Sequence, residues 1–131
     1  MKRILSILTL ILVVNIFSFA FENVNAKQFL QILKKEDKVI LLDVRTPEEY
    51  VKDGHIKGAN LLPVQVLPRY VNALKKYKDY TFLIYCHSGN RSSMASRFLE
   101  KAGFKKIYNL KGGIIEWKKE SLPVEYGKPS R

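Results

Sequence analysis

The sequence is poor in the residue types that build disulfide frameworks and metal sites. Its 131 residues include one cysteine and two histidines. A single cysteine excludes an internal disulfide, and a zinc site would need both histidines together with carboxylates. The chain also has no internal repeat, low-complexity tract or Pro/Gly-rich linker. These absences indicate one compact domain, since domains usually span about 100–150 residues.

Acidic residues are also scarce. Twelve Asp and Glu stand against 23 Lys and Arg, which gives a formal net charge of +11. A disordered chain is excluded because 47% of the residues are hydrophobic. The excess of positive charge is compatible with three kinds of partner: nucleic acid, anionic lipid or a small anionic substrate.

The first twenty residues predict export. Lys2 and Arg3 precede residues 4–21, which carry no charge. This pattern is typical of a secretory signal cleaved after Ala20, and a second small-residue pair ends at Ala26. An uncleaved membrane anchor is the alternative, because 18 residues lie at the lower end of what spans a bilayer. We therefore expect a periplasmic or secreted protein, with a net charge of +9 after cleavage. We expect no nucleic-acid partner, and contact with the membrane only if the N-terminal segment is not cleaved.

The remaining chain alternates helical and extended patterns. Apolar runs predict strands over residues 39–44, 59–62, 80–85 and 106–110. Helices are predicted over 25–37, 47–53, 66–77, 92–102 and 113–119, the first capped by Asn25 and the fourth closed by Gly103. This alternation predicts an α/β domain with a mainly parallel sheet, in which ligands sit beyond the carboxyl ends of the strands.

The only cysteine lies at such a place. Cys86 directly follows the predicted strand 80–85, and the loop to the next helix comprises His87, Ser88, Gly89, Asn90, Arg91 and Ser92. A strand–loop–helix turn with a central glycine can point backbone N–H groups inward, and this field favours a nucleophilic thiolate. A buried structural cysteine is the alternative, but a free thiol in an exported protein is open to oxidation, which favours the reactive interpretation.

Residues 86–92 resemble the active-site loop of the rhodanese-like sulfurtransferases, whose pattern is Cys-x-x-Gly-x-Arg followed by a small residue. Two further segments are similar to signatures of that family. Asp43-Val-Arg-Thr-Pro-Glu-Glu-Tyr50 with Gly54-His-Ile-Lys-Gly-Ala59 resembles the first. Leu110-Lys-Gly-Gly113, Trp117 and Leu122-Pro-Val124 resemble the C-terminal one. The three segments follow the family's order and span most of residues 25–125.

The resemblance implies a rhodanese-like domain over residues 21–131, with a five-stranded sheet flanked by helices. It implies that Cys86 accepts a sulfane sulfur from a donor such as thiosulfate and passes it to cyanide, a thiol or a sulfur-accepting protein. Residues 87–92 would bind the substrate, with Arg91 on the donor's negative oxygens. No cofactor or metal is implied.

Two other functions stay open. A persulfide carrier would hand its sulfur to a partner protein with little small-molecule turnover. A small Cys-dependent phosphatase is disfavoured, because related phosphatases have five residues between Cys and Arg and this loop has four.

The two histidines, Asp43 and Arg45 are interpreted as structural residues. We expect His55 to make structural hydrogen bonds. Asp43 and Arg45 resemble a chemical pair, but Glu48 and Glu49 lie within one helical turn of Arg45 and are its expected salt-bridge partners, so both residues are interpreted as scaffold. His87 is expected to shape the loop rather than act as a base. The excess positive charge is expected to draw small anions toward Cys86.

Overall fold

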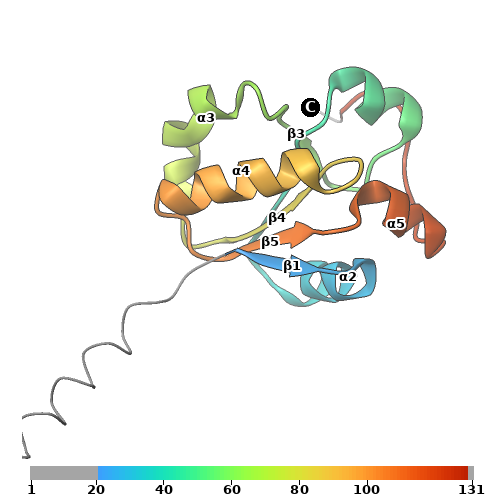
Figure 1. Cartoon of the computed structure of the whole chain (residues 1–131), viewed down its shortest axis with the longest axis horizontal. Helices are drawn as coiled ribbons and strands as arrows, with labels where there is room; N and C mark the ends of the chain where they lie inside the picture. Colours follow the sequence, from blue (N-terminus) through green and yellow to red (C-terminus); the bar gives the residue numbers. More distant parts are fainter. Residues whose placement is uncertain (1–20, 130–131) are drawn as a thin grey trace, which may run out of the picture.

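In a computed structural model, which describes residues 21–129, five parallel strands form one sheet (Figure 1). The strand order is β1-β5-β4-β2-β3. The strands are β1 (Glu22–Val24), β2 (Val39–Asp43), β3 (Asn60–Leu61), β4 (Thr81–Tyr85) and β5 (Ile107–Leu110). Because all strands run the same way, their carboxyl ends meet at one edge of the sheet and their beginnings at the other.

Helices cover both faces of the sheet. On one face, α2 (Ala26–Lys35) and α5 (Gly113–Lys119) pack with the π-helical turn Glu49–Asp53, and their core includes Phe29 and Trp117. On the other face lie α3 (Leu67–Leu74), which continues as a 3-10 turn over Lys75–Tyr77, and α4 (Asn90–Lys101). Figure 1 shows α3 and α4 above the strands and α2 below them. The predicted α/β fold with a five-stranded sheet flanked by helices is confirmed.

The best predicted elements are those whose local signals are strong. β4 is buried at all five residues and β2 pairs with it along its full length, as their continuous apolar runs predict. Helix α2 begins with a capping box, in which the Asn25 side chain accepts from the Gln28 N–H at 2.9 Å and the Gln28 side chain accepts from the Asn25 N–H at 2.9 Å.

One strand was missed and three predicted elements need correction. Strand β1 was not predicted, because three residues are too few to show a period; it pairs with β5, and Val24 is buried in it. Strand β3 has two residues rather than four. The short helix expected over 47–53 is π-helical from Glu49 to Asp53, and the helix expected to begin at Ser92 begins at Asn90.

The predicted signal or anchor, residues 1–20, lies outside the described residues. Within residues 21–129, no helix is long and apolar enough to cross a membrane.

Candidate active site

Cys86 lies directly beyond the carboxyl end of β4, and its sulfur accepts hydrogen bonds from two backbone N–H groups. The Gly89 N–H donates to Sγ at 3.1 Å and the Ser92 N–H at 3.4 Å. The Ser92 hydroxyl lies 3.3 Å from Sγ and also donates to the Gly89 carbonyl at 3.2 Å. The cysteine is 1% exposed. Donors aimed at one buried sulfur stabilise negative charge on that atom.

Two glycines let the C-terminal segment close against this loop. Gly89 has φ +103°, and a Cβ there would clash with the Lys111 carbonyl. Gly113 has φ +65°, and a Cβ there would clash with the His87 carbonyl. The Ile114 N–H donates to the Cys86 carbonyl at 2.9 Å, so the start of α5 is tied to the cysteine itself. Only glycine permits this backbone approach, which explains why glycines occupy both segments.

Arg91 is held by a residue 42 positions earlier in the chain. Its Nη1 and Nη2 donate to the two carboxylate oxygens of Glu49 at 2.8 and 2.9 Å. These hydrogen bonds are the main reason why the pKa of Glu49 falls from 4.5 to about 2, and they also raise the pKa of Arg91. One third of the Arg91 side chain remains exposed. The predicted contact of Arg91 with donor oxygens stays a prediction; in the structure its partner is Glu49.

Comparison with known proteins identifies the family to which this loop belongs. The sequence profile of the rhodanese-like domain matches residues 25–120. The chain belongs to the rhodanese-like domain family. A sulfurtransferase of Allochromatium vinosum is 36% identical over 101 residues, which cover 77% of this chain and 92% of that protein.

Two further proteins extend the likeness. The thiosulfate sulfurtransferase GlpE of Pseudoalteromonas translucida is 33% identical over 75% of this chain and 90% of its own length. A crystal structure of a rhodanese-like domain protein from Staphylococcus aureus superposes with a TM-score of 0.69 at 28% identity, over 82% of this chain and all of that one. The predicted family and fold are therefore confirmed.

Not every predicted loop residue of this rhodanese-like domain contacts the sulfur. Side chains of His87, Ser88 and Asn90 are exposed, and within residues 21–129 none of the three side chains forms a hydrogen bond. The His87 carbonyl accepts from the Ile115 N–H at 3.3 Å, as a loop-shaping residue would. Only the amides of Gly89 and Ser92 reach Sγ. The structure thus concentrates the direct contacts in two of the six residues.

Arg45 has a different partner from the one expected. Its guanidinium donates to both oxygens of Asp43 at 2.9 and 2.7 Å and to the Gly54 carbonyl at 2.7 Å, and both side chains are fully buried. The expected pair with Glu48 or Glu49 is therefore wrong, because Glu49 holds Arg91 and Glu48 pairs with Lys52 at 3.3 Å. The scaffold role stands, since Arg45 ties the carboxyl end of β2 to residue 54.

The neighbouring buried polar groups are also structural. The Tyr85 hydroxyl accepts from the Ile56 N–H at 3.0 Å, and burial raises the pKa of Tyr85 above its usual range. His55 confirms its predicted role: Nδ1 lies 2.8 Å from the Tyr50 carbonyl and its ring stacks on Tyr50 at 3.6 Å. No group of three or more His, Cys, Asp or Glu side chains gathers as a metal site in the part of the chain that the structure describes.

The residue that sequence reasoning missed at this site is Glu49. Its local neighbours suggested a pair with Arg45, and nothing in the spacing connects it with Arg91. The available signal was that Glu49 lies within the first family signature, Asp43–Tyr50. The fold places that signature beside the cysteine loop because β2 and β4 are adjacent strands.

Proposed function

We propose that this protein is a sulfurtransferase that moves a sulfane sulfur through a persulfide on Cys86. The donor is thiosulfate or a similar small anion, and the acceptor is cyanide or a thiol. The observation that carries the proposal is the pair of amides, from Gly89 and Ser92, aimed at Sγ. They contact the cysteine sulfur itself, which suits chemistry at that atom.

The first half-reaction loads the cysteine. The Cys86 thiolate attacks the outer sulfur of thiosulfate, a new S–S bond forms, and the S–S bond of thiosulfate breaks so that sulfite leaves with the electron pair. Electrostatic stabilisation by the loop amides then acts on the persulfide anion as it acted on the thiolate. Cys86 is buried, and only four residues separate it from Arg91, which favours a small donor over a bulky one.

The second half-reaction unloads it. Cyanide attacks the outer persulfide sulfur, a C–S bond forms, and the S–S bond breaks so that its electron pair returns to Cys86 as thiolate. The product is thiocyanate. Two half-reactions on one nucleophile require ping-pong kinetics.

The test combines a turnover assay with mass spectrometry. Purified protein with thiosulfate should gain one sulfur atom on Cys86 and, with cyanide added, should release thiocyanate. Cys86→Ser and Cys86→Ala should do neither while keeping the far-UV circular dichroism of the native fold. Absence of both the mass gain and thiocyanate rejects the proposal. A stable mass gain without turnover assigns a carrier whose acceptor is another protein.

We also propose that residues 1–20 export the chain, as a cleaved signal or as an anchor. Cleavage after Ala20 would leave β1 intact. Cleavage at the second candidate position, after Ala26, would remove β1 and the Asn25 cap of α2, and with them the buried Val24. N-terminal sequencing of protein from the periplasmic, secreted and membrane fractions tests the location and the cleavage together.

A further inference from the structure

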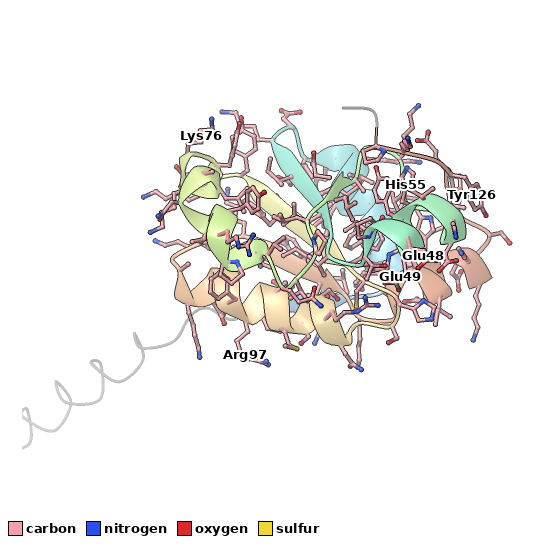
Figure 2. The ribbon with its side chains drawn as sticks, turned by 90° about the horizontal axis from the view of Figure 1, so that it is seen from above. Glu48, Glu49, His55, Lys76, Arg97 and Tyr126 are labelled. Atoms are coloured by element: carbon pink, nitrogen blue, oxygen red, sulfur yellow. The ribbon has the colours of Figure 1, made fainter. Side chains whose placement is uncertain are left out.

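Nine lysines of the domain lie at the edge of the sheet where the strands begin. Three lysines lie in residues 34–38, three in 75–78 and three in 101–106, and all nine are exposed. We call these nine lysines the basic edge. The Cys86 loop lies at the other edge, beyond the carboxyl ends of the strands. Figure 2 shows Lys76 at one end of the molecule and Glu48, Glu49 and His55 at the other.

The parallel register brings the three lysine groups together. Val39 of β2 pairs with Thr81 of β4, and Phe82 of β4 pairs with Ile107 of β5. The carbonyl of Lys38 accepts from the Thr81 N–H at 2.9 Å, and that of Lys106 accepts from the Phe82 N–H at 2.7 Å. The residues before three neighbouring strands therefore form one surface, although they are far apart in the chain.

These lysines have no ion-pair partner within the described residues. The salt bridges of residues 21–129, including Arg91 with Glu49 and Lys52 with Glu48, lie at the Cys86 end. Against these nine lysines stand five carboxylates at the same edge of the sheet, namely Glu22, Glu36, Asp37, Asp79 and Glu100. The edge therefore carries an excess of four positive charges. An unpaired charge of one sign on one surface attracts an extended partner of the opposite sign.

Helix stability accounts for only part of this arrangement. Lys34, Lys35 and Lys101 occupy the last turns of α2 and α4, where the helix dipole favours a cation. Lys38, Lys105 and Lys106 lie outside the helices. The dipole therefore gives no reason for the lysines in the loops.

Two tyrosines lie among the lysines. Tyr77 and Tyr80 are half-buried and meet edge to face at 5.2 Å. Lys38 and Lys76 extend over their rings, at 5.9 Å from Tyr80 and 5.3 Å from Tyr77. Lysine and tyrosine side chains with an apolar body and a polar tip are enriched where proteins meet the membrane–water interface.

The chain also enters the domain at this edge. Strand β1 begins at Glu22 and runs parallel to the others, so the residue before it lies at the edge where the strands begin (Figure 1). Phe21 lies there, under the Arg97 guanidinium at 5.7 Å. Residues 4–21 carry no charge and include 14 aliphatic or aromatic residues among 18. The last residue of the uncharged segment, Phe21, therefore lies at the edge that carries the lysines.

We propose that the basic edge lies on an anionic membrane surface, with residues 4–20 retained in the bilayer. Lysines beside a membrane-inserted segment are attracted by anionic headgroups, and the attraction acts within about one Debye length. This orientation turns the Cys86 loop away from the bilayer toward aqueous donors and acceptors. The charge then orients the domain, rather than steering anions to Cys86.

The experiment compares hydrogen exchange of the full chain in two kinds of vesicle. One contains equal parts of phosphatidylglycerol and phosphatidylcholine, and the other contains phosphatidylcholine alone. Backbone amides in residues 36–38, 76–80 and 103–106 should exchange about tenfold more slowly in the anionic vesicles. Amides in residues 87–90 should exchange equally in both. About 0.5 M salt should remove the difference.

A pair of matched variants assigns the effect to the basic edge. Changing Lys38, Lys78, Lys105 and Lys106 to Gln should abolish the protection. Changing Lys52, Lys57, Lys119 and Lys128 to Gln removes the same charge at the Cys86 end and should preserve it. Both should retain thiosulfate sulfurtransferase activity, which separates this proposal from the proposed function.

Several results would overturn the proposal. They are equal exchange in the two vesicles, protection of the Cys86 loop instead of the basic edge, and equal behaviour of the two variants. N-terminal sequencing that finds the cellular protein beginning at Phe21 would remove the anchor and also overturn it. Tighter binding of a 20-nucleotide RNA than of anionic vesicles, lost in the basic-edge variant alone, would reassign the surface to nucleic acid.

Discussion

The guanidinium of Arg91 and the carboxylate of Glu49 form two parallel hydrogen bonds, at 2.8 and 2.9 Å, between the first family signature and the cysteine loop. Glu49 stands on the π-helical turn after β2, and Arg91 on the first turn of α4. The pair holds the arginine beside the loop and offsets its charge. A donor anion at Cys86 therefore meets an arginine that already has a partner.

The ion pair predicts how stability depends on pH. The pKa of Glu49 is about 2 in the folded state and 4.5 in its ordinary state. Its contribution is complete above pH 4.5 and is lost as the pH falls toward 2. Glu49→Gln should cost about 1–3 kcal/mol at pH 7 and lose less stability than the wild type between pH 4.5 and 2, measured by urea unfolding. Glu48→Gln, at the exposed pair with Lys52, is the control and should follow the wild type.

Two glycine substitutions separate backbone strain from loop closure. Gly103 has φ +102° with nothing near a Cβ, so Gly103→Ala should cost about 1–3 kcal/mol and leave activity intact. Gly89 has φ +103° and also faces the Lys111 carbonyl, so Gly89→Ala should cost more and displace an N–H from Sγ. Thermal unfolding and thiocyanate formation measure both effects. Equal losses in the two variants would show that the Lys111 contact is unimportant.

The buried pair of Asp43 and Arg45 predicts non-additive effects. Asp43→Asn leaves a buried guanidinium without its counter-charge and should destabilise the domain by about 3–5 kcal/mol. The double variant Asp43→Leu with Arg45→Met should be less destabilised than the sum of its single changes. Chemical unfolding of the wild type, the single variants Asp43→Leu and Arg45→Met, and the double variant closes the cycle. Strict additivity would contradict the direct coupling.

The contact between the Ser92 hydroxyl and Sγ predicts that this hydroxyl contributes modestly to the rate. Ser92→Ala removes the group 3.3 Å from Sγ but retains both backbone N–H donors. We expect kcat/KM for thiosulfate to fall about 5–10-fold, the value of one net hydrogen bond. Ser93→Ala, the next residue on α4, is the matched control and should be unaffected. A loss beyond about a hundredfold would assign the hydroxyl a larger role than the amides.

Short-range signals account for what could be predicted. The apolar runs of β2 and β4 identify the centre of the sheet, and Asn25 and Gly103 identify helix ends because caps act over three or four residues. The loop from Cys86 to Ser92 was found because its residue types and spacing are local. Strand β1 could not be predicted because it forms by pairing with β5, which lies more than 80 residues later in the chain.

Residue order alone determined the cysteine loop, the alternation of strands and helices, and the number of positive charges. Only the tertiary structure decided which charges meet. In the folded domain Arg91 forms an ion pair with Glu49, and Arg45 forms one with Asp43, although local spacing favoured other partners. The tertiary structure also gathered nine lysines at one edge and left Cys86 at the other, because parallel strands place all their beginnings together. Ion pairs and surface fields depend on the distances between charges, and these distances are fixed only when the sheet forms.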